Sequence, residues 1–403
     1  MTASVAGEPW LTSPATRAVL EALQAEGGPD CVRFVGGSVR NALMGQPVDD
    51  LDLATRLLPE VSMAALKTAG LKVVPTGLAH GTVTAVSKGR PYEITTLRRD
   101  VETDGRKAVV AFTDDWAEDA ARRDFRLNAL YADADGQVFD PTGHGVDDAR
   151  EGRIVFVGDP ETRIREDYLR ILRFFRFFAW YGRGEPDAAG LKACADLSEG
   201  MVRLSAERVS KELLKLLAAP DPRPSVRAMA NSGVLQAILP EAEPLAAFET
   251  MVDLSTDPVL RLSALLSPDT AHVETAARRL RLANAVRERL IEAAGGEADL
   301  AMDDRTARVQ IYRLGRPVFI DRVLRAEAQT GQAGAGSNLI ALAEGWAIPR
   351  LPIGGRQVAA AGLPAGPLTG RILAAFEDDW VADDFPGHGH AERLRALVEA
   401  LRE

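Results

Sequence analysis

The 403-residue chain is 46% hydrophobic and carries a formal net charge of −10 at pH 7. A chain of this length can bury a large core and is expected to fold as more than one domain. The acidic balance argues against a protein that coats nucleic acid nonspecifically, because neutralising phosphates requires a basic surface. No apolar run approaches the roughly 20 residues that a membrane helix needs, so we expect no membrane partner.

Two cysteines, Cys31 and Cys194, are too few and too far apart to suggest a disulfide framework or a thiolate metal site. We expect two buried or idle thiols and no disulfide-linked partner. The amino-terminal residues lack the basic start and apolar core of a secretory leader. We therefore expect a cytoplasmic protein.

The first 150 or so residues alternate short strand-like runs with helical ones. Strands are expected where β-branched or aromatic residues lie between glycine, proline or aspartate, at 31–35, 51–54, 82–86, 92–97 and 137–139. Leucine and alanine at helical spacing predict helices at 14–25 and 38–44, and Gly45 follows the second as a stop. This part is expected to be a mixed α/β domain.

After about residue 155 the pattern becomes one amphipathic helix after another. Expected helices include 161–180, 206–218, 223–232, 271–282 and 306–314. The first of these interleaves arginines with aromatic residues, which suits contact with RNA bases or, equally, a core helix with a solvated arginine face. The stretch QAGAGS at 332–337 predicts a linker or loose turn. The carboxy-terminal part is expected to be all-α.

Residues 33–55, RFVGGSVRNALMGQPVDDLDLAT, open with features of an anion site. Gly36 and Gly37 predict a tight turn between a strand and a helix, where backbone N–H groups approach an anion closely. Ser38 lies in the first turn of that helix, whose partial positive charge adds to the attraction. Arg40 would supply a fixed cation. A purely structural turn is the alternative.

The second half of the same stretch predicts a metal site. Asp50 and Asp52 lie two residues apart on a strand-like segment, so strand periodicity places both carboxylates on one face. Two like charges so close are unfavourable unless a cation lies between them. Mg²⁺ prefers carboxylate ligands combined with substrate phosphates. Glu93, in a neighbouring strand-like run, is the candidate third carboxylate for two-metal chemistry, or else an exposed strand glutamate.

These residues resemble a known family. GGSVRN followed by DDLDLAT resembles the head of the class II tRNA nucleotidyltransferases, which share the DNA polymerase beta-like nucleotidyltransferase fold with bacterial poly(A) polymerases. Further matching motifs follow in order: RRDFRLNALY at 122–131, DPTGHGVDDAREGRI at 140–154, EDYLRILR at 166–173 and SAERVSKELLKLL at 205–217. The resemblance implies an α+β protein. A catalytic head with a mixed sheet would occupy residues 1–155, a helical neck that selects the nucleobase 156–220, and a helical body and tail that bind tRNA 221–403.

The resemblance also assigns roles to residues of two motifs. In the first, Arg123, Asp124 and Asn128 would hold the ribose and phosphates of the nucleotide. The alternative is that Asp124 simply caps a helix. Asn128 ends this motif, and Arg126 stands where the family usually has threonine. Asn41 likewise stands where the family usually has aspartate.

The second motif would choose the base. Asp167 and Arg170 are three apart on a predicted helix, so they share a face and could offer an acceptor and donors to a base edge. The resemblance implies that this pair is an amino-acid template for CTP and then ATP, and that Arg173 completes the nucleotide site. A plain salt bridge within the helix is the alternative.

The implied activity is Mg²⁺-dependent addition of CMP, CMP and AMP from CTP and ATP to the 3′ end of tRNA, with release of pyrophosphate. PTGLAHGTVTAV at 75–86 resembles CCA-adding members rather than poly(A) polymerases, and 98–116 resembles the flexible loop of enzymes that complete CCA. A poly(A) polymerase or A-adding enzyme of the same fold remains an alternative. Alternatives of other classes are a catalytically idle RNA-binding protein and an unrelated sugar-nucleotide transferase, the latter leaving the two arginine motifs unexplained.

Overall fold

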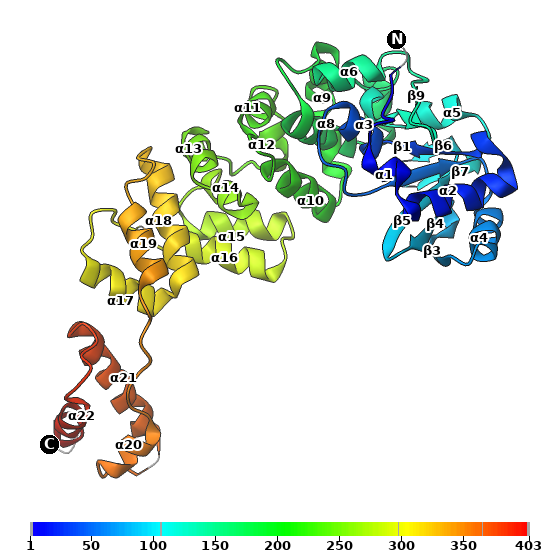
Figure 1. Ribbon diagram of the computed structural model, residues 1–403. Coiled ribbons are helices and arrows are strands. Elements are labelled where there is room, and N and C mark those ends of the chain that lie inside the picture. Colours follow the sequence, from blue (N-terminus) through cyan, green and yellow to red (C-terminus); the bar gives the residue numbers. More distant parts are fainter. Residues whose placement is uncertain (1–2, 105–106, 297, 365, 401–403) are drawn as a thin grey trace. The chain divides into compact units, whose positions relative to one another are not determined.

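The computed structural model describes residues 3–104, 107–296, 298–364 and 366–400 (Figure 1). The chain divides into two compact units, residues 1–240 and 241–403. The first contains a mixed sheet followed by helices and the second is helical, which confirms the expected α+β class. None of the helices within the described ranges is long and apolar enough to cross a membrane. Cys31 and Cys194 are both buried, free thiols, as expected.

Seven strands of the described residues form one sheet in the order β3-β4-β5-β2-β1-β8-β9. Their bounds are Val32–Val35 for β1, Asp52–Thr55 for β2, Lys72–Gly77 for β3, Thr82–Ser87 for β4, Arg90–Thr96 for β5, Tyr131–Ala132 for β8 and Val138–Phe139 for β9. Strands β2 and β5 run parallel, and the other paired strands of this sheet, as described, run antiparallel. The expected strands are confirmed to within about two residues at each end.

Helices of the head surround this sheet. They are α1 (Pro9–Thr12), α2 (Pro14–Gly27), α3 (Gly37–Leu43), α4 (Pro59–Thr68), α5 (Trp116–Ala121) and α6 (Gly145–Glu151). Helices α2 and α4 pack against each other and against β4. Thr16 on α2 lies within hydrogen-bonding distance of the buried Tyr92 hydroxyl on β5, at 3.0 Å. This packing fixes β5, and with it the position of Glu93.

Residues 98–112, expected as part of a flexible loop, form a separate two-stranded hairpin. Its strands are β6 (Arg98–Asp104) and β7 (Lys107–Phe112), paired antiparallel. Residues 105–106 lie outside the described residues. The expectation of a loop is therefore replaced by a hairpin along the described part of the segment.

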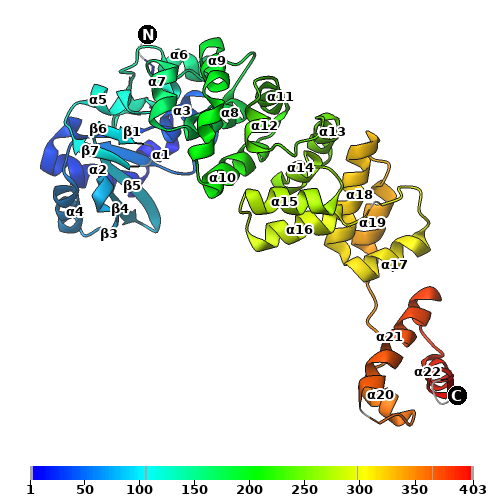
Figure 2. The ribbon, with the colours of Figure 1, turned by 180° about the vertical axis from the view of Figure 1, so that it is seen from behind.

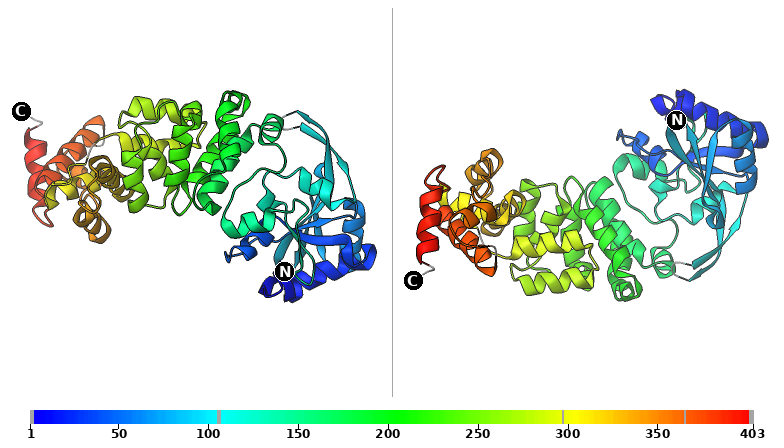
Figure 3. Two further views of the ribbon diagram at one scale, coloured as in Figure 1. Left: turned by 90° about the horizontal axis from the view of Figure 1, so that it is seen from above. Right: turned by 90° about the horizontal axis from the view of Figure 1, so that it is seen from below.

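The helices that follow in the first unit are α7 (Pro160–Glu166), α8 (Leu169–Tyr181), α9 (Ala188–Asp196), α10 (Ala206–Leu217), α11 (Arg223–Asn231) and α12 (Val234–Ile238). In Figures 2 and 3 most of these helices, drawn in green, lie to one side of the blue and cyan strands of the sheet. The phenylalanines of α8 are buried; the ring of Phe174 stacks on Phe156 at 5.6 Å and lies 6.4 Å from Phe125 of the head. The aromatic residues of this basic segment are thus mostly core.

The prediction of a single helix at 161–180 is wrong, because the helix is interrupted between α7 and α8. Asp167 has an extended backbone, with φ −153° and ψ 107°. Its Oδ1 accepts a hydrogen bond of 3.1 Å from the backbone N–H of Leu169 at the start of α8. A short carboxylate that bonds the nearby backbone competes with helix continuation, which periodicity alone does not reveal.

The second unit begins with α13 (Ala246–Leu254), α14 (Pro258–Ala264), α15 (Thr270–Arg279), α16 (Asn284–Ala294), α17 (Asp304–Leu314), α18 (Arg316–Thr330) and α19 (Ser337–Gly345). The expected loose linker at 332–337 is an ordered loop. The buried Glu327 carboxylate accepts hydrogen bonds from the backbone N–H groups of Gly334, at 3.1 Å, and Gly336. A buried acceptor therefore fixes a segment whose composition suggested looseness.

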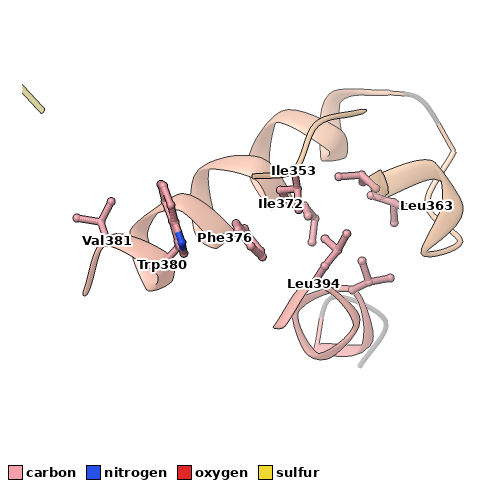
Figure 4. Packing of buried hydrophobic residues seen from close by; sticks show 9 residues of the cluster. Ile353, Leu363, Ile372, Phe376, Trp380, Val381 and Leu394 are labelled. Atoms are coloured by element: carbon pink, nitrogen blue, oxygen red, sulfur yellow. The ribbon is translucent and has the colours of Figure 1, made fainter. Parts of the chain in front are cut away.

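The chain ends in α20 (Gly355–Ala360), α21 (Pro367–Ala382) and α22 (His390–Ala400). Figure 4 shows their small core, in which Phe376 and Ile372 of α21 face Leu394 of α22. Residues 221–240, assigned to the body on sequence grounds, belong to the first compact unit. The functional division at residues 155 and 220 stays a prediction.

Candidate active site

The diglycine turn joins β1 to α3. Gly36 has φ 68° and ψ −117°, a conformation that residues with a side chain rarely adopt. Its N–H donates 3.1 Å to the carbonyl of Leu130, which ties the turn to the segment before β8. A Cβ built on Gly36 would lie 3.6 Å from Nη1 of Arg123. The turn therefore faces that guanidinium across a gap without a side chain.

Gly36→Ala is expected to lower the free energy of unfolding by about 1–2 kcal/mol, through backbone strain rather than collision. The nearest atoms to the added Cβ would be at 3.6 Å, which is ordinary contact. Gly37→Ala is the matched control, because Gly37 lies inside α3 without a positive φ. Urea unfolding of both variants measures the difference; equal stabilities would contradict the strain argument.

Three carboxylates gather at one end of β2 and β5. Asp52 begins β2 and is directly paired in register with Glu93 of β5. Exposure alternates along the chain, with Asp50 and Asp52 exposed and Leu51 and Leu53 buried, the pattern of two carboxylates on one face. Desolvation of its carboxylate raises the pKa of Asp52 to about 6, aided by the charges of Glu93 and Asp50 and opposed by Arg123. This cluster was expected from the sequence.

None of these three carboxylates forms a hydrogen bond or ion pair with another side chain in the described part of the protein. Carboxylates that repel one another and form no ion pair are unfavourable, and a divalent cation between them would relieve that repulsion. Among the described residues no group of three or more His, Cys, Asp or Glu side chains is arranged to hold a metal. Mg²⁺ is suited to such a site, because it usually binds through one or two carboxylates together with substrate phosphates. Asp50 and Asp52 fit that role.

Arg123 is the cation of the site. Its Nη2 and Nε donate hydrogen bonds of 2.9 Å and 3.2 Å to the carboxylate of Asp119. Its Nε also donates a hydrogen bond of 3.2 Å to the Tyr131 hydroxyl. Within the described ranges its Nη1 has no acceptor, and this is the atom nearest the Gly36 turn. Arg123 thus presents one free guanidinium nitrogen to the diglycine turn, and its charge acts on Asp52.

Sequence reasoning missed Asp119 and Tyr131, which hold Arg123 in place. The Tyr131 hydroxyl donates 2.7 Å to Oδ2 of Asp119, so the three side chains form a closed group. Asp119 lies four residues before Arg123, and that spacing is a signal for an ion pair. Tyr131 comes from β8, and no local pattern linked it to the arginine.

Arg40, the expected fixed cation beside the turn, is held by bonds to other protein side chains. Its side chain is buried. Its Nη1 donates a hydrogen bond of 2.5 Å to Oδ1 of Asn128. Its Nη2 donates two hydrogen bonds of 2.8 Å, one to Oδ1 of Asn41 and one to the Tyr181 hydroxyl. Burial lowers the pKa of Arg40. The unusual Asn41 therefore orients Arg40, and direct contact of Arg40 with a triphosphate stays a prediction. The Ser38 hydroxyl also bonds protein, donating 3.4 Å to the carbonyl of Val35.

A chain of polar contacts continues from Arg40 through two other motifs. Nδ2 of Asn128 donates 3.1 Å to Oδ1 of Asp124, and Nε of Arg173 donates 2.8 Å to Oδ2 of Asp124. Although burial opposes ionisation, the charge and hydrogen bonds of Arg173, with further bonds from Asn128 and the Phe125 N–H, lower the pKa of Asp124 to about 2. The helix-capping alternative for Asp124 does not describe these contacts. Three motifs far apart in the sequence meet in one buried network.

Arg126, the second departure from the family pattern, binds the nearby acidic motif. Its Nε donates 2.7 Å to Oδ2 of the fully buried Asp148, whose Oδ1 accepts 3.0 Å from Nε of Arg153. A Cβ on Gly145 would lie 2.5 Å from the carbonyl oxygen of Arg126, so glycine is required for α6 to approach the loop. Arg126 is a structural link for the loop that carries Arg123 and Asn128.

Asp167 and Arg170 do not form the salt bridge that was the alternative to base selection. Oδ2 of Asp167 accepts 2.7 Å from Nη2 of Arg208 on α10. Nη1 of Arg170 donates 2.8 Å to the carbonyl of Arg163 and also to the carboxylate of Glu166. Asp167 lies in the break between α7 and α8, Arg170 lies in the first turn of α8, and each has its own partner.

The chain is similar to known proteins over most of its length. Residues 32–155 match the sequence family described as poly A polymerase head domain. Residues 186–245 match the family described as a probable RNA- and SrmB-binding site of polymerase A. The mitochondrial CCA tRNA nucleotidyltransferase 1 of Danio rerio is 32% identical over 366 residues, covering 87% of this chain and 83% of that protein. The chain belongs to the CCA tRNA nucleotidyltransferase family. The human mitochondrial relative is also 32% identical, over 87% of this chain and 82% of its own.

The fold of this family member is shared by solved structures. A CCA-adding enzyme of Bacillus stearothermophilus in complex with CTP aligns with a TM-score of 0.76 and 27% identity over 97% of this chain and 98% of its own. The Thermotoga maritima CCA-adding enzyme complexed with tRNA aligns with a TM-score of 0.71 at 19% identity, over 100% of this chain and 99% of its own, which shows the fold alone. Because relatives include mitochondrial proteins, the cytoplasmic location stays a prediction.

Proposed function

We propose that this nucleotidyltransferase adds CMP, CMP and AMP from CTP and ATP to the 3′ end of tRNA without a nucleic-acid template. The carboxylates of Asp50, Asp52 and Glu93 beside the free Nη1 of Arg123 carry the proposal. The names of the relatives, CCA tRNA nucleotidyltransferase and CCA-adding enzyme, support it. Residues 1–155 would perform catalysis, 156–220 would select the base, and 221–403 would bind tRNA, in the cytoplasm.

In each addition the 3′-hydroxyl of tRNA attacks the α-phosphorus of the nucleotide. A new P–O bond forms, the bond to the bridging oxygen breaks, and pyrophosphate leaves. Asp50 and Asp52 would hold Mg²⁺, which lowers the pKa of an attacking hydroxyl and stabilises charge on leaving oxygens. Glu93 adds negative charge next to Asp52 and would support this site.

The remaining residues bind and orient the nucleotide. The N–H groups of Gly37 and Ser38 and the free Nη1 of Arg123 would receive the phosphates, while Gly36, whose own N–H bonds the carbonyl of Leu130, would shape the turn. Arg40, Asn128, Asp124 and Arg173 form the network that holds the ribose side of the site. Asp167 and Arg170 would choose the base.

The deciding experiment uses tRNA that lacks its 3′ end. With CTP alone the product should lengthen by two nucleotides, and with CTP and ATP it should lengthen by three and stop. A poly(A) polymerase, which the name of the matching head model keeps as a second candidate, would extend with ATP alone into a ladder. An A-adding enzyme would act only on tRNA that already ends in CC. An idle RNA-binding protein would bind tRNA and extend nothing.

A further inference from the structure

The carboxylate of Asp167 is held from two sides. Oδ1 accepts 3.1 Å from the N–H of Leu169, and Oδ2 accepts 2.7 Å from Nη2 of Arg208. An ionised carboxylate has about four acceptor positions, so about two remain for a ligand. The side chains of Arg208 and Asp167 keep 26% and 23% of their surface exposed, so this pair is open to a ligand on one side.

Arg208 reaches Asp167 from a different helix, and the spacing of the two helices is fixed elsewhere. Helices α8 and α10 pack along each other. Nε of Arg176 on α8 donates 2.5 Å to the carboxylate of the buried Glu212, and Nε1 of Trp180 donates 2.8 Å to the carbonyl of Lys215. Arg208 therefore extends from a rigidly docked helix, and its guanidinium sets the orientation of the Asp167 carboxylate.

Arg170 is held independently of Asp167. Only its Nη1 has acceptors, Glu166 and the carbonyl of Arg163, within the described part of the chain. Its Nε and Nη2 remain available as donors. The pair thus offers a fixed acceptor from Asp167 and donors from Arg170.

We propose that Arg208 is a specificity-determining positioning residue that aims the free acceptor positions of Asp167 at the amino group of the incoming base. This inference rests on the proposed function. Cytosine and adenine each present an exocyclic amino donor, whereas uracil and guanine present a carbonyl oxygen in its place. A carboxylate fixed in one orientation accepts a hydrogen bond from the amino group and repels the carbonyl oxygen. Without Arg208 the carboxylate turns about its own axis, and the discrimination weakens.

The test compares Arg208→Ala and Arg208→Lys with the wild-type full chain on tRNA lacking its 3′ end. The readout is kcat/KM for CTP and for UTP. Arg208→Ala should lower the CTP value about tenfold, the effect of losing one charged hydrogen bond. The UTP value should hold or rise, so the CTP/UTP ratio falls by at least about tenfold. Arg208→Lys, which keeps the charge, should recover part of the ratio.

Arg165→Ala is the matched control, because Nη2 of Arg165 makes a 2.8 Å ion pair with Glu161 on the exposed face of the neighbouring α7. Its CTP/UTP ratio should equal that of the wild type. An unchanged ratio in Arg208→Ala, or equal losses for CTP and UTP in both Arg208 variants, would overturn the inference while leaving CCA addition in place. Failure of the wild-type protein to add CMP would instead overturn the proposed function.

Discussion

Asp52→Asn is expected to reduce nucleotide addition by at least about 10³-fold, while the fold and tRNA binding stay nearly intact. The substitution removes a full negative charge from the end of β2 but keeps the size of the side chain. Asp52 forms no ion pair with the described residues, so no structural contact is lost. Single-turnover addition of CMP measures the chemical step, and a gel-shift assay with tRNA measures binding. Retained activity would contradict the assignment of Asp52.

The same variant should be more stable than the wild type when no divalent cation is present. Because the pKa of Asp52 is raised to about 6, the folded protein keeps a proton that the unfolded chain loses near pH 4. Stability therefore falls as the pH rises from about 4 to about 6, and the full penalty applies above that window. Asp52→Asn removes this loss of folding stability. The expected gain is small because solvent screens the charge of an exposed residue. In EDTA its unfolding midpoint should exceed that of the wild type by roughly 2 °C at pH 7.5 and match it near pH 4.

Much of the site could be predicted because its signals are local. The positive φ of Gly36 follows from the glycine pair itself, and the shared face of Asp50 and Asp52 follows from the two-residue period of a strand. The pairing of Glu93 with Asp52 is not a local signal. It joins two parallel strands, β2 and β5, that are separated in the chain by α4, β3 and β4. Glu93 was chosen because it lies in a neighbouring strand-like run, and the sequence left an exposed strand glutamate as the alternative.

The contacts that could not be predicted are those between distant segments. Arg40 has the position of a phosphate ligand, but its donors meet Asn128 and Tyr181, which lie 88 and 141 residues further along the chain. The break at Asp167 depends on one side-chain hydrogen bond that helical periodicity does not encode. Sequence patterns report which face a residue occupies, whereas the partner on that face is set by packing.

Asp124→Asn is expected to cost about 3 kcal/mol of stability and to impair nucleotide addition. Asp124 is buried and pairs with Arg173, and removal of one partner leaves the other charge uncompensated. The depressed pKa of Asp124, about 2, means that its contribution is complete above about pH 4 and is lost as the pH falls through 2. The difference from the wild type should therefore be constant from pH 5 to 8. Urea unfolding at those pH values measures it.

A double-mutant cycle separates the ion pair from the rest of the network. Arg173→Met keeps an unbranched apolar stem and removes the charge, so Asp124→Asn/Arg173→Met should recover much of the stability that either single variant loses. It should not recover activity, because Asn128 and Arg40 still lack the carboxylate that orients them. The exposed pair of Glu161 and Arg165 provides the control, and Glu161→Gln should cost less than about 0.5 kcal/mol. A double variant as unstable as the sum of its singles would show that Asp124 stabilises the head through contacts other than Arg173.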